Sequence, residues 1–239
     1  MNTYEQIFNQ RGRSYHLAME KYPAARNEEF NNIIEKLRLN EGGTILDIPA
    51  GGGYLKQFLR NVNYLGYDFS GEFESGHDGI KKCKESKIDL TDECVNEIVS
   101  LAALHHIVDR KAFYAEMHRI LKRGGQLVIA DVSAKSHIAT FLNGFVDQWN
   151  SMGHQGNFIC ENDLNELTNS GFEVTITTKS YFWNFHNSHA AMDFFRLLFC
   201  LDLQPPKRDL KESLMSLGVI SNDDRYSINW ELSYLVCKK

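Results

Sequence analysis

A glycine-rich turn and an acid that follows it could together bind a nucleoside. Three glycines, residues 51–53, come shortly after the apolar run 45–48, and Asp68 ends a second apolar run, 62–67. Glycine lets a ligand approach the backbone closely, and an acid at the end of a strand can accept hydrogen bonds from ribose hydroxyls. Because ligands of doubly wound sheets bind beyond the carboxyl ends of the strands, we expect the turn and Asp68 at one rim.

The same turn lacks the signatures of two common nucleotide sites. Gly51-x-Gly53-x-x is followed by Lys56, so the third glycine of a dinucleotide fingerprint is missing, and no Gly-Lys-Ser/Thr sequence occurs in the chain. A pyrophosphate ligand is therefore disfavoured. A nucleoside that carries a small zwitterion fits better, because Asp47 could organise the turn and face an ammonium group.

The elements that would position these residues begin with a βαβ unit. The run 45–48 predicts a short buried strand, and apolar residues at helical spacing predict a helix that begins near residue 52 and leads into strand 62–67. Two helices are predicted within residues 1–39. Near the other end, the pattern predicts a helix over 161–170, a strand over 172–180 and a final strand over 227–238.

Five motifs follow one another along the chain: the strand and turn 44–53, the acid Asp68 after strand two, 87–90 at the end of strand three, 96–106 through strand four, and 121–131 through strand five. In these motifs and their order the chain resembles the class I S-adenosylmethionine-dependent methyltransferases, in particular small-molecule members with a Leu-His-His motif. Pro49-Ala50 replaces the usual Gly-Cys pair, and Arg123 replaces a proline. The resemblance implies an α/β fold with a doubly wound, Rossmann-like sheet of seven strands and an antiparallel final strand at one edge.

The resemblance also implies S-adenosyl-L-methionine as the cofactor. The glycine turn would hold its methionine end, and the acids after strands two and three would hold its nucleoside end. The expected cofactor contacts are Asp47, Pro49, Ala50, Gly51, Gly53, Asp68, Phe69, Asp89, Leu90, Leu101 and Tyr15.

A pair of histidines and one aspartate are the candidate catalytic residues. His105 and His106 follow strand four, and Asp131 ends strand five on the same rim. A hydroxyl acceptor benefits from a base, and either histidine could serve. Alternatively, one histidine caps or packs the following helix, and Asp131 ties down a loop. We expect no metal, because the spaced pair His186 and His189 has no acid nearby.

Two helical regions are candidates for the substrate pocket. The leading helices within 1–39 are expected to form a lid that excludes water, with Tyr4, Phe8 and Arg11 facing the substrate, although each could equally be an ordinary core or surface residue. Residues 135–158 are expected to form a cap after strand five that contributes Trp149 and His154. A second insertion, 184–224, is too apolar for a disordered loop and ends near Gln204-Pro205-Pro206.

Composition favours one enzyme domain that acts on a small molecule. A chain of 239 residues with 43% apolar content can bury a sizeable core, so we expect a single methyltransferase domain over 1–239. The net charge of −5 and the absence of a long basic run disfavour nucleic acid. No membrane span or signal sequence is expected, and five scattered cysteines indicate reduced thiols. We therefore expect a cytoplasmic transferase, monomeric or homodimeric.

Three functions remain open at this point. The first is S-adenosylmethionine-dependent methyl transfer to a small-molecule metabolite, with oxygen as the expected acceptor, by in-line displacement. The second is methylation of RNA or protein. The Asn/Asp-Pro-Pro-Tyr/Phe signature of enzymes that methylate planar amino groups is absent, since the chain has Ser100-Leu101-Ala102-Ala103 there. The third is a cofactor-binding protein without catalysis.

Overall fold

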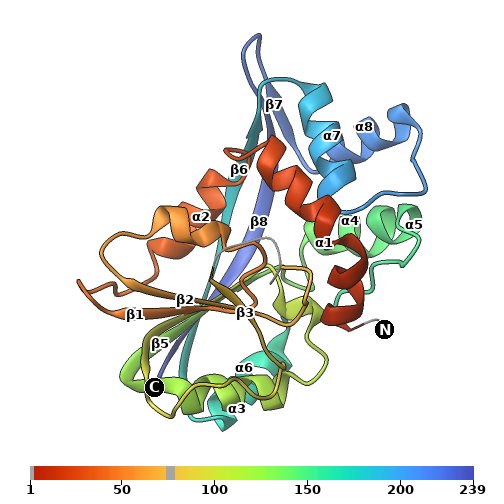
Figure 1. Ribbon diagram of the computed structural model, residues 1–239. Coiled ribbons are helices and arrows are strands. Elements are labelled where there is room, and N and C mark those ends of the chain that lie inside the picture. The colour runs from red at the N-terminus through yellow and green to blue at the C-terminus, as the bar shows by residue number, and fades with distance from the viewer. Residues whose placement is uncertain (1–2, 74–78) are drawn as a thin grey trace.

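The computed structural model describes residues 3–73 and 79–239, and these form one mixed sheet of eight strands (Figure 1). The strand order is β3-β2-β1-β4-β5-β8-β6, and β7 pairs with β8 beyond this path. The five strands β3, β2, β1, β4 and β5 run parallel to one another, whereas β8 is antiparallel to β5, β6 and β7. The strands are β1 (Thr44–Asp47), β2 (Asn63–Asp68), β3 (Ile80–Lys82), β4 (Val95–Leu101), β5 (Leu121–Asp131), β6 (Glu173–Phe185), β7 (Val219–Ser221) and β8 (Tyr226–Lys238).

This topology confirms the doubly wound α/β fold, but the number and order of the strands differ in part from the prediction. The antiparallel final strand was expected at one edge, but β8 lies between β5 and β6. An eighth strand exists because β6 and β8 extend beyond the sheet and leave room for the short β7 to pair with β8. Strand three was expected to end at 87–90, which is wrong: β3 is Ile80–Lys82, and residues 87–90 form no strand.

The helix predicted after the glycine turn is also wrong in kind. The segment forms a short 3₁₀ helix, η1 (Tyr54–Phe58), and the chain is extended again at Leu59. The stretch between Gly53 and β2 is too short for several α-helical turns followed by a return to the sheet. The two helices predicted within 1–39 are confirmed as α1 (Tyr4–Lys21) and α2 (Asn27–Ile34).

Helices cover both faces of the sheet, and the strand sequences explain why. Neighbouring residues of a strand point to opposite faces, and both Ile45 and Leu46 are fully buried, each in a different hydrophobic cluster. One cluster contains α2, part of α1 and the helices α4 (His137–Phe141), α7 (Ser188–Leu198) and α8 (Lys207–Ser216). The other contains α3 (Arg110–Ile120) and α6 (Glu161–Asn169), which lie together on the opposite side in Figure 1.

Helix α1 lies beside α7 and reaches the carboxyl ends of the parallel strands (Figure 1). Thr3 and Gln6 form a capping box at its start. Ser14 Oγ donates a hydrogen bond of 2.8 Å to the carbonyl of Leu197, which ties α1 to α7. One side of α1 therefore points at the rim where a ligand of this fold would bind.

The cap region after β5 continues from α4 through a π-helical turn, η3 (Leu142–Val146), into α5 (Asp147–Trp149).

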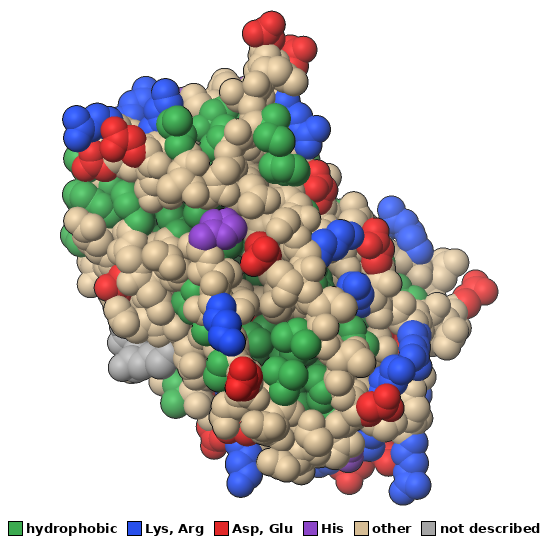
Figure 2. Space-filling model, turned by 180° about the vertical axis from the view of Figure 1, so that it is seen from behind, with side chains coloured by type: hydrophobic (Ala, Val, Ile, Leu, Met, Phe, Trp, Pro, Cys, Tyr) green, Lys and Arg blue, Asp and Glu red, His purple; other side chains and the backbone are tan. Residues whose placement is uncertain are grey.

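Within the described residues, no helix combines the length and apolar character needed to cross a membrane. On the face shown in Figure 2, Lys and Arg side chains are interspersed with Asp and Glu.

Candidate active site

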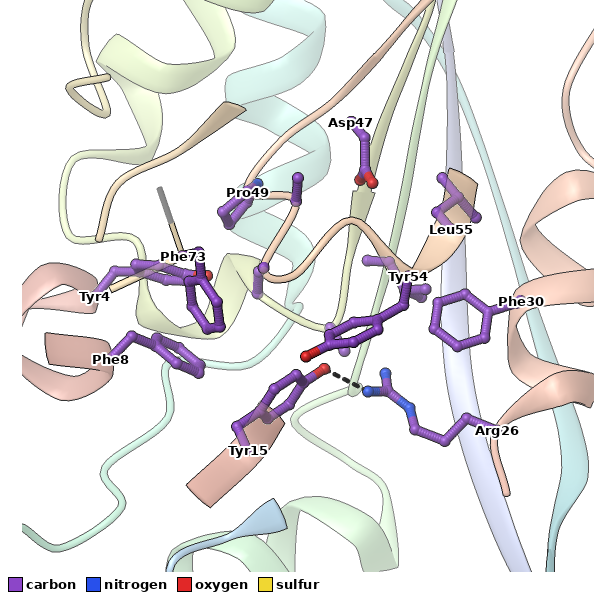
Figure 3. A pocket seen from close by; sticks show the side chains of 15 residues that line it. Tyr4, Phe8, Tyr15, Arg26, Phe30, Asp47, Pro49, Tyr54, Leu55 and Phe73 are labelled. Carbon is purple, nitrogen blue, oxygen red and sulfur yellow. Dashed lines mark hydrogen bonds between the residues drawn. The ribbon is translucent and has the colours of Figure 1, made fainter. Parts of the chain in front are cut away.

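A cavity with a volume of about 50 Å³ opens at the carboxyl ends of β1 and β4. Figure 3 shows Tyr4, Phe8 and Phe73 together on one side and Tyr15, Tyr54 and Arg26 on another, with Asp47 at one end. Six of the expected cofactor residues line this first cavity: Asp47, Pro49, Ala50, Gly51, Leu101 and Tyr15. These six residues, which the sequence placed at several separate positions, thus lie around one cavity.

The glycine turn has the backbone geometry that its composition predicts. Gly51 and Gly53 have φ of +52° and +70°, a region that favours glycine. A Cβ on Gly51 would enter the first cavity and come within 3.9 Å of Tyr54 and 4.0 Å of Tyr15. Gly53 shapes the turn but does not line this cavity.

Asp47 is a buried carboxylate without a cationic partner. Tyr64 Oη donates a hydrogen bond of 2.7 Å to it, and among the described residues no Lys or Arg lies within ion-pair distance. Burial raises the pKa of Asp47 to about 7, partly opposed by the Tyr64 hydrogen bond. An ammonium group bound in the cavity would supply the missing positive charge.

Asp68 lies directly behind the glycine turn and is fully buried. It accepts hydrogen bonds from Gly51 N–H (2.8 Å), Ser70 N–H (2.8 Å) and the Tyr4 hydroxyl (3.0 Å). Burial raises the pKa of Asp68 to about 6, although these hydrogen bonds oppose the shift. Phe69 is buried beside Tyr4, with ring centroids 5.3 Å apart. Tyr4 thus occupies an acceptor that ribose hydroxyls would need.

Two expected nucleoside contacts lie elsewhere. Asp89 is exposed, and the Leu90 N–H already donates a hydrogen bond of 2.8 Å to the carbonyl of Ile88. Both follow from the misplaced third strand, because the carboxyl end of β3 is at Lys82. Neither residue lines a cavity described here.

A second cavity, with a volume of about 60 Å³, adjoins the first. The two share four lining residues, which are Phe8, Tyr15, Arg26 and Ala102. Of the predicted substrate residues, Phe8, Arg11 and His154 line the second cavity and Tyr4 lines the first. Trp149 lines neither and packs near Phe145 instead, with ring centroids 6.4 Å apart.

His105 and Asp131 form a dyad at the second cavity. His105 Nδ1 lies 2.7 Å from Asp131 Oδ1, and Asp131 Oδ2 accepts the His105 backbone N–H at 3.1 Å. Asp131 is fully buried, which raises its pKa, but His105 and the hydrogen bonds outweigh burial and lower the pKa below its ordinary value. Because an ionised carboxylate only accepts, His105 Nδ1 carries the proton and Nε2 is left as an acceptor.

His106 and His154 complete a buried group of three imidazoles whose candidate ligand atoms lie within 4.8 Å of one another. Burial lowers the pKa of both rings well below the ordinary value, helped by His105 and Arg11. Arg11 Nη2 lies 3.1 Å from His106 Nε2, and arginine can only donate. When the His106 ring is neutral, Nε2 accepts from Arg11 and Nδ1 carries the proton, so neither nitrogen offers a free lone pair to a metal. The absence of a metal stays a prediction.

Several residues that line the cavities are not among those that the sequence predicts. The pairing of β6 with β8 sets Tyr181 opposite Trp230, so Trp183, two residues further along β6, lies next to Trp230. The two tryptophan rings stack with centroids 4.0 Å apart and line the second cavity. Arg26 lines both cavities and is paired with buried Glu29 and with the Tyr15 hydroxyl (Figure 3). Strand pairing and helix packing bring these residues in, and no local motif marks them.

Comparisons with known proteins agree with this fold and site. Residues 46–129 match the methyltransferase domain family. The ubiquinone/menaquinone biosynthesis C-methyltransferase UbiE of Geobacter sp. (strain M21) is 29% identical over 119 residues, which cover 42% of this chain and 50% of that protein. The matched region thus spans about half the length of these curated relatives.

Solved structures extend the likeness over most of the chain. A putative methyltransferase from Bacillus halodurans has a TM-score of 0.61 at 21% identity and covers 89% of this chain and 99% of that one. A Haemonchus contortus phosphoethanolamine N-methyltransferase in complex with S-adenosylhomocysteine has a TM-score of 0.60 at 12% identity, covering 100% of this chain and 60% of that one. At these identities the likeness concerns the fold.

A doubly wound sheet with a glycine turn after its first strand defines a class of nucleoside-cofactor proteins. Residues 46–129 of the chain are similar to the methyltransferase domain, and its fold is that of the class I S-adenosylmethionine-dependent methyltransferases. S-adenosyl-L-methionine is the cofactor of this class, and the first cavity fits its methionine end, because Asp47 lacks a cation and Gly51 leaves room that a Cβ would fill. The Leu-His-His subgroup stays a prediction.

Proposed function

We propose that the protein transfers a methyl group from S-adenosyl-L-methionine to a small-molecule metabolite that carries an acidic hydroxyl group. The observation that carries this proposal is the buried His105–Asp131 dyad in a second cavity that shares a wall with the cofactor cavity. The second cavity is lined by aromatic side chains and a few buried polar groups, a lining that is typical of small-molecule sites.

The residues of the chain would orient the acceptor and remove its proton. Asp131 fixes the ring of His105 so that Nε2 is free to accept a proton from the hydroxyl. Aromatic side chains around both cavities exclude water from the reacting atoms. The cofactor, when bound, supplies an electrophilic methyl group for in-line displacement.

Hydroxyl oxygen is the acceptor that we propose first. The UbiE relatives are named C-methyltransferases, which favours a second candidate, transfer to carbon. In a hydroxylated aromatic acceptor, this atom would be a ring carbon next to the hydroxyl. Removal of the hydroxyl proton would activate either atom, so the dyad supports both. Proton–carbon NMR correlation spectra of the product, which separate O-methyl from C-methyl groups, would decide between them.

Release of S-adenosylhomocysteine in the presence of a panel of hydroxylated metabolites tests the proposal. We expect His105→Gln to lower kcat/KM by about 10²–10⁴-fold, the usual contribution of a general base, while the affinity for S-adenosylhomocysteine stays unchanged. His186→Gln, at an exposed histidine outside both cavities, is the matched control. Full turnover by His105→Gln would refute the base assignment. Cofactor binding without turnover on any acceptor would favour the non-catalytic alternative.

A further inference from the structure

Arg11 is a buried cation that no carboxylate of the described residues neutralises. Its side chain lines the second cavity and is 5% exposed. Within the described residues, its one hydrogen-bonding partner is the neutral ring of His106, its Nε–H has no acceptor, and no acid lies within ion-pair distance. The guanidinium carbon also lies 5.2 Å from the centre of the Phe8 ring.

The neighbouring Arg26 shows how this fold stabilises a buried cation when it has no need of a ligand. Arg26 is equally buried, but it is paired with the fully buried Glu29. Burial lowers the pKa of Arg11 to about 10, so the group remains protonated at neutral pH. A buried charge without a counter-ion is costly, and proteins keep one where a ligand of opposite charge binds.

We propose that the substrate carries a carboxylate that pairs with Arg11 in the second cavity. The inference rests on the proposed function and names the chemical class of its substrate. A single negative charge matches the one unpaired positive charge that the described residues place there, since Arg26 is neutralised by Glu29 and the pKa values of His106 and His154 are lowered. A phosphate dianion would exceed it.

The rest of the second cavity is lined largely by aromatic and aliphatic side chains, which suit a flat apolar group. Trp183 and Trp230 stack with an interplanar angle of 17°, and Phe199 lies nearly parallel to Trp230 at 6.1 Å. Such faces pack well against an aromatic ring. The carboxylate on Arg11 and a hydroxyl on His105 would then orient a hydroxylated aromatic acid, because both polar groups line the same cavity.

Binding measurements without turnover test this class of substrate. The probes are hydroxybenzoate and hydroxynaphthoate isomers, each compared with its carboxamide, which has a similar shape and no charge. We expect at least one carboxylate to bind and raise the melting temperature, and its amide to bind at least about tenfold more weakly, as expected for a charge-assisted hydrogen bond. Equal affinities within every acid–amide pair would overturn the proposal, as would tighter binding of phenyl phosphate.

Two variants separate Arg11 from general effects of the helix. Arg11→Met is expected to fold, because it removes an unpaired buried charge, and to lose the preference for the carboxylate. Arg13→Met is the matched control, since Arg13 is exposed two residues further along α1. Arg11→Lys keeps the charge without the planar fork, so it should retain part of the preference even if Arg11→Met fails to fold.

The affinity for S-adenosylhomocysteine excludes the rival ligand. If Arg11 instead binds the carboxylate of the cofactor, Arg11→Met will weaken S-adenosylhomocysteine by tenfold or more and leave the acid–amide preference unchanged, which would overturn the proposal. Failure of the proposed function would look different: carboxylates would bind through Arg11, but no acceptor would release S-adenosylhomocysteine.

Discussion

At the scale of single residues, acids at three strand ends have different environments and therefore suit different tasks. Asp131 at the end of β5 is stabilised as an anion by His105, and its pKa is lowered. Asp47 at the end of β1 has no cationic partner among the described residues, and burial raises its pKa to about 7. The pKa of Asp68, at the end of β2, is intermediate at about 6. The negative charge of Asp131 is thus stabilised within the protein, whereas a bound cationic group would stabilise that of Asp47.

The raised pKa of Asp47 predicts a pH-dependent affinity for S-adenosylhomocysteine. In the free protein Asp47 is largely protonated below about pH 7. An ammonium group next to it favours the ionised form, so binding releases a proton, and the affinity should rise with pH by up to about tenfold per unit before levelling above about pH 7. Isothermal titration calorimetry between about pH 5 and 8 measures this dependence.

Asp47→Asn provides the control, because its neutral amide cannot release a proton. In this variant the affinity should be lower and flat between about pH 6 and 8. A remaining slope below about pH 6 would come from Asp68. If the parent protein shows no pH dependence, Asp47 does not face the ammonium group.

Much of the candidate site could be predicted at this scale. Asp47, Gly51, His105 and Asp131 were identified because each follows a strand whose end is marked by a local motif, and all four lie at or directly behind the two cavities. Arg26 could not be found, because its position depends on the packing of α2 against β6. Pairing across space leaves no periodic signal in one sequence.

At the scale of elements, α1 both lines the cavities and restrains one of them. Its Tyr4 hydroxyl donates to Asp68 at 3.0 Å, so the start of α1 is attached to the end of β2. A nucleoside whose ribose hydroxyls use Asp68 must replace this donor. Binding at the nucleoside end thus competes with a contact between two elements.

Tyr4→Phe removes this competing donor while keeping the ring in place. We expect the affinity for S-adenosylhomocysteine to rise by about 3–10-fold, which is the net value of one hydrogen bond, and the melting temperature of the free protein to fall. Tyr22→Phe is a matched control, because Tyr22 also donates to an aspartate, Asp193, but lies outside both cavities. A weaker affinity in Tyr4→Phe would show that the hydroxyl contacts the bound cofactor instead.

The elements that the sequence predicted well are those with a buried apolar run or a clear helical period, such as β1, β4, β5 and α6. The short elements were predicted poorly. Strand β3 has three residues and one buried side chain, and the apolar pattern over η1 predicts a longer helix than the structure has. Strand β7 forms because β8 extends past the sheet and offers an edge, which is a property of the partner strand and not of residues 219–221.

At the scale of the whole molecule, the two cavities depend on each other because they share a wall. Phe8 and Tyr15 come from α1, Arg26 precedes α2, and Ala102 follows β4. The wall therefore joins the N-terminal helices to the centre of the sheet. A ligand in either cavity fixes side chains that a ligand in the other must also contact.

This shared wall predicts positive coupling between S-adenosylhomocysteine and an aromatic carboxylate. The first ligand fixes Phe8 and Tyr15, and ordering one side chain costs about 0.5–1.5 kcal/mol, so the second ligand should bind about 3–10-fold more tightly. Calorimetric titration of the carboxylate with and without saturating S-adenosylhomocysteine measures the factor, and the reverse titration must give the same factor, since coupling free energy is reciprocal. Phe8→Ala should lower the coupling, whereas Trp149→Ala, outside both cavities, should not. Equal carboxylate affinities in both titrations would mean that the common residues are already rigid in the free protein, and that the cavities bind their ligands independently.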